Sequence, residues 1–155
     1  MLFRSDRVVK IRSETPVLAV VDGLHGFGQT VAPQAVEIGI EKCRQMGLAA
    51  IALRNAGHIG RVGDWAEMAA AAGFVSIHFV NAAGSSLVAP YGGVDRRFST
   101  APYCVGVPRP GEGPIVLDFA TSIVAEGKVL NASFGGKAIP DDALIAPDGA
   151  VSGDP

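Results

Sequence analysis

The chain has 155 residues, the size of one ordinary domain, which is enough to bury a hydrophobic core. Hydrophobic residues make up 48% of it and charged residues 18%, a composition typical of globular rather than disordered proteins. The formal net charge is -2 and no basic run is longer than Arg96-Arg97, which argues against the clustered positive face of a nucleic-acid-binding protein.

No stretch of the sequence predicts export or a membrane span. The N-terminus has no apolar run long enough for a signal peptide, and nothing approaches the roughly 18 apolar residues of a spanning helix. Cys43 and Cys104 lie in apolar contexts without a close Cys or His partner. We therefore expect two buried free thiols, no metal site and a cytoplasmic location.

The first half of the chain predicts alternating strands and helices. Apolar runs predict strands at residues 16–21, 48–53 and 74–80, the second of them buried on both faces. The first strand is expected to end in a turn at Asp22-Gly23. Between the strands we expect a helix from Thr30, its N-cap, to a stop at Gly47, and a second helix over about 62–72. This order is typical of an α/β protein.

Beyond Asn81 the sequence is rich in Gly, Pro and Ser, and the expected elements are shorter. Strands are predicted near 103–107 and 114–119, with a helix near 122–131. Residues 132–155 are expected to be mostly turn and loop, because they contain Gly135-Gly136 and two prolines.

Three histidines are candidates for chemistry. His78 lies inside an apolar strand, where a satisfied structural histidine is the better account, and His25 lies in a glycine-rich loop that can contact a ligand. His58 follows a strand, precedes a helix and is flanked by Gly57 and Gly60. The ligand crevice of open α/β sheets lies beyond such a strand end, and an imidazole there can exchange a proton with a substrate oxygen. By position alone, a loop histidine that only caps the next helix remains the alternative.

A nucleotide cofactor would need another contact region, because no Gly-x-Gly-x-x-Gly precedes a helix and a Rossmann site is therefore not supported. Residues 117–122, Leu-Asp-Phe-Ala-Thr-Ser, form a strand that runs into Thr121 and Ser122. These hydroxyls can cap a helix whose N–H groups face a ligand, or serve only as a strand exit and helix cap.

Several short motifs occur in collinear order from about residue 16 onward. They include Asp22-Gly23 with Gly26-Phe27-Gly28-Gln29, Arg54-Asn55 with Gly57-His58 and Gly60, Ala66-Glu67-Met68-Ala69, Val88-Ala89-Pro90-Tyr91-Gly92-Gly93, Val116 to Ser122, Gly127-Lys128-Val129, Ile139-Pro140 and Asp154-Pro155. The ordered set resembles the malate/L-lactate dehydrogenase family that includes ureidoglycolate, sulfolactate and diketogulonate dehydrogenases, which differs from the Rossmann-type lactate and malate enzymes.

The resemblance implies an α/β (α+β) fold similar to sulfolactate dehydrogenase: an NAD(P)-binding domain with a mixed, largely antiparallel sheet flanked by helices. It implies an NAD- or NADP-dependent oxidoreductase that interconverts a 2-hydroxy acid and a 2-oxo acid, as a homodimer whose partner completes the site. His58 matches the proton acceptor or donor. The expected cofactor contacts are Asn81, at the start of one loop, and Asp118, Phe119, Ala120, Thr121 and Ser122, at the nicotinamide end.

This sequence also departs from the family pattern. The usual Thr-Asn-Pro is Thr100-Ala101-Pro102 here, and the loop from Ala82 to Leu87 has Ala where some members place Ser. Family members extend beyond both ends and begin with a helical segment that carries Ser-His-Gly and a nearby Arg. Residues 1–155 are therefore expected to be a single domain, the central cofactor-binding portion. The alternative is a catalytically weak cofactor-binding or dimerisation module.

Overall fold

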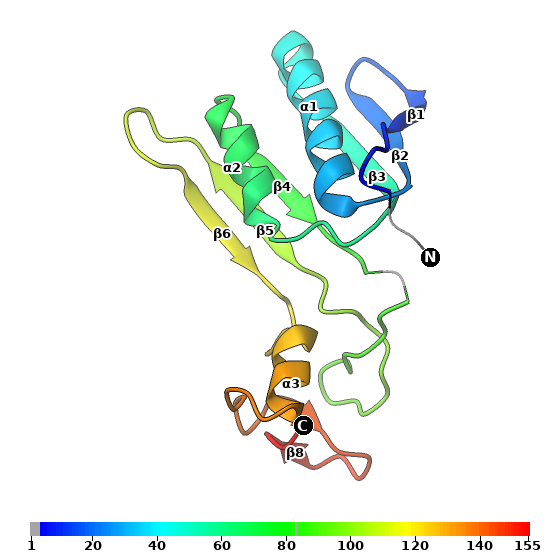
Figure 1. Ribbon diagram of the computed structural model, residues 1–155. Helices are drawn as coiled ribbons and strands as arrows, with labels where there is room; N and C mark the ends of the chain where they lie inside the picture. Colours follow the sequence, from blue (N-terminus) through cyan, green and yellow to red (C-terminus); the bar gives the residue numbers. More distant parts are fainter. Residues whose placement is uncertain (1–3, 83) are drawn as a thin grey trace. The chain divides into compact units, whose positions relative to one another are not determined.

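The computed structural model describes residues 4–82 and 84–155 (Figure 1). The chain divides into two compact units: the first holds the residues up to 78 and residues 104–117, and the second holds residues 79–103 and 118–155. In chain order the elements are β1 (Lys10–Glu14), β2 (Leu18–Gly26), α1 (Gly28–Met46), β3 (Ala50–Ala56), α2 (Gly63–Ala71), β4 (Ser76–Phe79), β5 (Tyr103–Val107), β6 (Ile115–Phe119), α3 (Glu126–Ser133), β7 (Leu144–Ile145) and β8 (Val151–Ser152).

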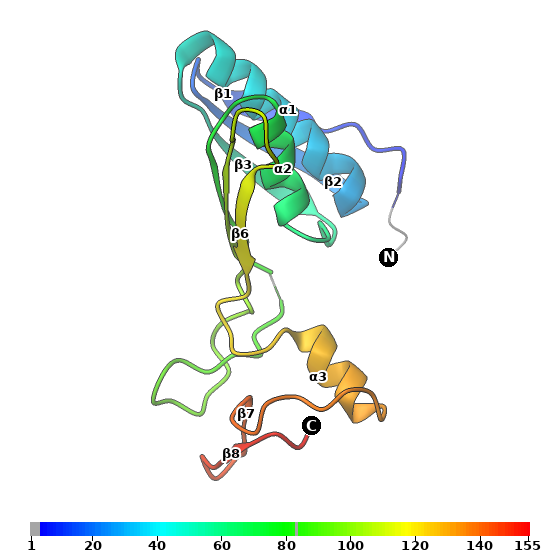
Figure 2. The same cartoon turned by 90° about the vertical axis from the view of Figure 1, so that its left-hand side faces the viewer.

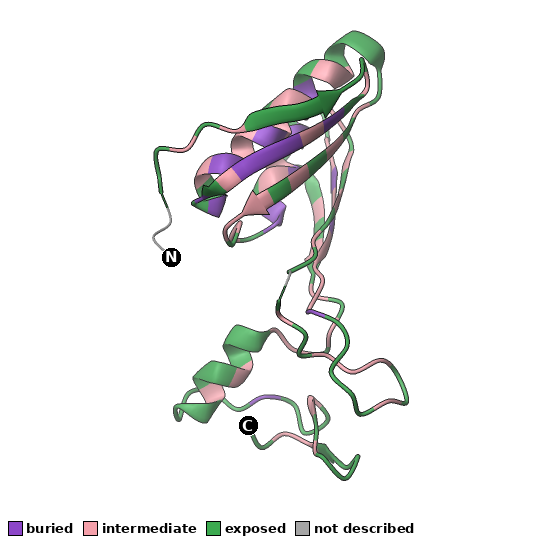
Figure 3. Ribbon diagram, turned by 90° about the vertical axis from the view of Figure 1, so that its right-hand side faces the viewer, coloured by how far each residue is buried: buried purple, intermediate pink, exposed green. Residues whose placement is uncertain are grey.

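The sheet β1–β2–β3 holds the core of the first unit. β1 is antiparallel to β2 and β2 is parallel to β3, so this sheet is mixed. Helix α1 covers one face (Figure 2), where Ala19 and Val21 of β2 pack with Ala35 of α1 and with the half-buried Ile51 and Leu53 of β3. Neither helix of the first unit lies over the opposite face (Figure 3).

The expected order of strand, helix, strand, helix and strand is confirmed by β2, α1, β3, α2 and β4. The prediction that the first strand ends in a turn at Asp22-Gly23 is wrong, because β2 continues to Gly26. Its pairing with β3 is interrupted after Asp22 and resumes at Gly26, which lies opposite Ala56. This stretch, in which Leu24 and His25 have positive φ, therefore forms a bulge within a strand rather than its end.

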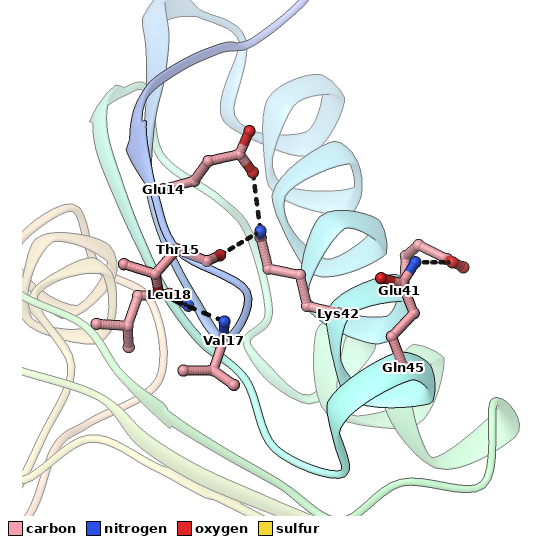
Figure 4. A network of polar contacts seen from close by, with 7 residues as sticks. All are labelled: Glu14, Thr15, Val17, Leu18, Glu41, Lys42 and Gln45. Atoms are coloured by element: carbon pink, nitrogen blue, oxygen red, sulfur yellow. Dashed lines mark hydrogen bonds and ion pairs between the residues drawn. The ribbon is translucent and has the colours of Figure 1, made fainter.

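Helix α1 begins two residues before the predicted start. Phe27 is the N-cap and makes no side-chain cap hydrogen bond, so the prediction of Thr30 as N-cap is wrong. The end is as predicted: Gly47 has a left-handed φ of 80° and donates its N–H to Cys43 O at 2.8 Å. Near this end, Lys42 Nζ joins α1 to the β1–β2 turn by donating to Glu14 Oε2 and to Thr15 O, both at 2.8 Å (Figure 4).

Strand β3 is not buried on both faces as predicted. Its residues alternate between exposed and half-buried, because only the face toward α1 is covered. The prediction of two buried thiols holds for Cys104, which is fully buried, but not for Cys43, which is half-buried on α1; neither forms a disulfide. Within the described residues, no helix is long and apolar enough to cross a membrane.

A second sheet has the order β4–β5–β6, and α2 lies against one of its faces. Cys104 of β5 is fully buried, and a Cβ on Gly106 would meet the carbonyl oxygen of Ala66 at 2.8 Å. Strand alternation turns the exposed Ile77 of β4 and Leu117 of β6 to the other face. The strands predicted near 103–107 and 114–119 are confirmed as β5 and β6.

The second unit consists mainly of loops, together with helix α3. The tail, residues 132–155, is mostly irregular as the sequence predicts, except for the short antiparallel hairpin β7–β8. The helix predicted near 122–131 begins only at Glu126, and its N-cap is Ala125. The prediction that Thr121 or Ser122 caps this helix is wrong, because both hydroxyls bond carbonyl oxygens outside it.

Candidate active site

The parallel strands β2 and β3 meet at one buried carboxylate, at the point where their regular pairing is interrupted. Asp22, whose side chain is 3% exposed, accepts hydrogen bonds at Oδ1 from Leu24 N at 2.9 Å and from Asn55 Nδ2 at 3.1 Å. At Oδ2 it accepts from Arg12 Nε at 3.0 Å and Nη2 at 2.9 Å, while Arg54 Nε lies 3.7 Å away. Donors from β1, β2 and β3 thus converge on one side chain.

These donors lower the pKa of the Asp22 carboxyl to about 2. The largest cause is the hydrogen bond from the Leu24 backbone, followed by that from the Asn55 amide; burial opposes them, and Arg12 lowers the pKa further. Asp22 is therefore ionised at neutral pH, and its charge is balanced by the arginines on either side.

Three residues around this carboxylate have a backbone conformation that L-residues seldom adopt. The φ angles are 53° at Leu24, 55° at His25 and 51° at Asn55. Such angles are disfavoured for side chains other than glycine, and they persist where surrounding contacts hold them. Two of the three, Leu24 and Asn55, donate to the same oxygen of Asp22.

The segment that holds His58 is anchored on several sides within the first unit. Gly57 N donates to Gly26 O at 3.0 Å, and Trp65 Nε1 of α2 donates to Ile59 O at 3.1 Å. Gly28, the first residue of α1, lies against the backbone so closely that a Cβ there would collide with the carbonyl oxygens of Gly57 and His58. This contact requires a residue without a side chain.

The His58 ring is exposed, and one of its nitrogens is occupied. Nδ1 accepts a hydrogen bond from Gly60 N at 3.1 Å. Because an acceptor nitrogen carries no proton, the neutral ring has its proton on Nε2, which is the nitrogen left to a ligand. His58 thus stands just beyond the carboxyl end of β3, as the sequence predicts.

The other two histidines have different surroundings. The His78 ring lies on β4, with Nε2 at 3.0 Å from Ser76 Oγ, in agreement with a satisfied structural histidine. His25 is exposed at the bulge of β2. Arg61, just after Gly60, is held by Asp64 and Glu67 at 2.7 Å each, and these hydrogen bonds raise its pKa.

The expected cofactor contacts lie in the second unit, and residues 99–102 form hydrogen bonds near both groups of them. Asn81 is exposed; its neighbours Val80 and Ala82 donate to Pro102 O at 3.0 Å and to Ser99 Oγ at 3.4 Å. Thr121 N donates to Thr100 O at 2.9 Å. The structure therefore brings the chain on either side of Asn81 and the end of the 118–122 segment to the same four residues, 99–102.

The 118–122 segment offers an apolar wall beside polar atoms. The ring of Phe119 packs edge-on against Tyr103 with centroids 5.8 Å apart, and Tyr103 also contacts Phe79 at 5.4 Å. The Thr121 hydroxyl donates to Thr100 O and to Ala101 O, at 3.2 and 3.1 Å, which leaves its oxygen able to accept. Ser122 Oγ donates to Val124 O at 2.8 Å.

These residues fit a nicotinamide group in chemical type: a partly exposed phenyl ring for the apolar ring, and oxygen acceptors and an exposed amide for the carboxamide. Two hollows on the first unit, one along α1 and β1 and one along β1–β2–β3, include none of the predicted site residues. Among the described residues no cluster of His, Cys, Asp or Glu could hold a metal ion.

Sequence reasoning did not single out Asp22, Arg12, Asn55 or Gly28 as residues that shape the site. The available signal was an acidic residue directly after the apolar run of one strand and Arg54-Asn55 directly after the next. Polar residues at the carboxyl ends of two neighbouring parallel strands meet at one edge of the sheet.

Known proteins resemble this chain in sequence and in structure. The chain is 48% identical over 146 residues to hydroxycarboxylate dehydrogenase B of Escherichia coli O157:H7, an alignment that covers 94% of this chain and 40% of that protein. Among solved structures it matches malate dehydrogenase from Entamoeba histolytica, at 29% identity and a TM-score of 0.87, over 94% of this chain and 40% of that one.

Sulfolactate dehydrogenase from Methanocaldococcus jannaschii matches at 33% identity and a TM-score of 0.81, over 94% of this chain and 42% of that one. The chain therefore spans about two fifths of the length of these relatives. The family model for malate/L-lactate dehydrogenase matches residues 2–155. This chain belongs to the malate/L-lactate dehydrogenase family.

Proposed function

We propose that this chain is the central portion of an NAD- or NADP-dependent dehydrogenase that interconverts a 2-hydroxy acid and a 2-oxo acid. The observation that carries the proposal is the His58 ring: it is exposed at a strand end, with Nδ1 closed by Gly60 and Nε2 open, in a chain that belongs to a dehydrogenase family. The names of the relatives, which include malate and L-lactate dehydrogenases, support the substrate class.

In the direction of reduction, the protonated ring of His58 donates its Nε2–H to the carbonyl oxygen of the 2-oxo acid and gives up that proton as the oxygen becomes a hydroxyl, which leaves a neutral imidazole. The exposed ring then regains a proton from solvent. When bound, the nicotinamide supplies the hydride that reaches the carbonyl carbon. The segment Asp118 to Ser122 would hold its nicotinamide end, and Asn81 would be a further contact to the cofactor.

The test is a fluorescence titration of the chain with NADH and with NADPH, followed by turnover of pyruvate, oxaloacetate and glyoxylate. We expect binding of one cofactor and turnover of at least one acid, with turnover lowered about 100-fold or more by His58→Ala. The matched control is His78→Gln, which changes a histidine bonded within β4 and should retain turnover.

Turnover that survives His58→Ala would contradict the assigned proton exchange. Binding without turnover in the unchanged chain would favour the alternative, a cofactor-binding or dimerisation module. This outcome has a physical basis, because relatives more than twice as long can supply further site residues.

A further inference from the structure

The Asp22 carboxylate lies on the face of the sheet that does not pack against the core. Ala19 and Val21 turn toward α1 and form the core, whereas Asp22 is on the opposite face of β2, which neither helix of the first unit covers. A buried carboxylate is costly unless hydrogen bonds satisfy it, and here donors from three strands do so. Packing alone therefore does not explain a carboxylate at this position.

The two carboxylate oxygens have separate partners. Oδ2 accepts from the Arg12 guanidinium, which balances the charge. Oδ1 accepts from Leu24 N and from the Asn55 amide, the two partners with positive φ. Oδ2 thus forms the ion pair, and Oδ1 binds the two residues that have unusual backbone geometry.

Asn55 is the residue at which the chain turns toward His58. A φ of 51° there sets the direction of the next residues, and Gly57 is bonded to Gly26 only two positions later. If Asn55 returned to the ordinary negative φ, the short link to His58 could not keep its contacts with Gly26 and Gly28.

We propose that Asp22 is a positioning residue for His58: through Oδ1 and the Asn55 amide, its carboxylate fixes the path of residues 55–60 and holds Nδ1 of the ring on Gly60 N–H. The proposal rests on the proposed function of His58 for its catalytic meaning. The geometry it describes can be measured without cofactor or substrate.

The experiment is NMR of the full chain with Asp22→Ala, Asn55→Ala and, as matched control, Arg12→Gln, which removes the hydrogen-bond donor to Oδ2 and leaves both donors to Oδ1 in place. Two readouts report the His58 contact: hydrogen exchange of the Gly60 amide, and the chemical shift of that amide. We expect exchange to accelerate about tenfold or more, and the chemical shift to move to that of an amide without the His58 hydrogen bond, in Asp22→Ala and Asn55→Ala. Arg12→Gln should keep both, even where it lowers global stability.

The amide of Val21, in the core of the same strand, reports global opening and separates it from local change. A folded Asp22→Ala variant whose Gly60 amide behaves as in the unchanged chain overturns the proposal, as does an equal effect of Arg12→Gln. If Asp22→Ala does not fold, Asn55→Ala decides by the same criteria. Failure of turnover alone bears on the proposed function and leaves this measurement unaffected.

Discussion

At the scale of single residues, Ala101 has a backbone conformation that is unfavourable for alanine. Its φ is 32°, in a region where the Cβ of an alanine meets the backbone. Asn tolerates positive φ better than other residues with a side chain. The segment is held by Thr121, whose hydroxyl donates to Ala101 O.

Ala101→Asn should therefore raise the free energy of unfolding by about 0.5–1 kcal/mol, measured by urea denaturation. The matched control is Ala138→Asn, an exposed loop alanine whose φ is not positive, which should change stability by less than about 0.5 kcal/mol. If the two variants behaved alike, or if Ala101→Asn lost stability, the φ of Ala101 would not be a source of strain.

At the scale of elements, the first turn of α1 and the His58 segment are built as one piece. Gly28→Ala places a Cβ against the carbonyl oxygens of Gly57 and His58, both of them backbone atoms that cannot rotate away. We expect a loss of about 1–3 kcal/mol in the free energy of unfolding, together with displacement of the His58 signals in NMR spectra.

Gly127→Ala is the matched control for this prediction. Gly127 also lies in the first turn of a helix, α3, and a Cβ added there would meet no heavy atom within 4 Å outside its own stretch of helix. Because alanine reduces the freedom of the unfolded chain, this variant should gain about 0.4–1 kcal/mol. Equal losses in both variants would mean that helix starts in this protein resist alanine for reasons unrelated to His58.

The elements with an apolar pattern could be predicted from the sequence, and those made by pairing could not. Helices α1 and α2 and strands β5 and β6 follow their hydrophobic periodicity. Strand β1, Lys-Ile-Arg-Ser-Glu, is exposed throughout and exists because β2 offers it a partner. Strands β7 and β8 have only two residues each, which is too short for a pattern.

The candidate site also contains one residue that the sequence predicts and others that it does not. His58 could be predicted because it depends on local order: it follows one strand and precedes one helix. The role of Asp22 could not, because its partners Arg12 and Asn55 are 10 and 33 positions away in the chain. A carboxylate beside a glycine predicts a turn, and only the pairing of β2 with β3 shows that Asp22 lies within β2, opposite Arg54.

At the scale of the whole molecule, the first unit leaves one apolar face uncovered among the described residues. Ile77 and Leu117 are 56% and 52% exposed on the side of β4–β5–β6 away from α2, and their neighbours Val75 and Ile115 are exposed as well. Contiguous exposed apolar surface of this kind favours association, and in water a second copy of the chain can cover it.

We therefore expect sedimentation velocity to show concentration-dependent association of the unchanged chain, and the double variant Ile77→Lys with Leu117→Lys to sediment as a monomer over the same range. The lysines add charge at the centre of the face, where its burial is costly. Leu48→Lys is the matched control: it changes a leucine that is 69% exposed in the α1–β3 connection, off this face, and should leave association intact. A monomeric unchanged chain, or a control that dissociates as the double variant does, would show that the face does not drive association.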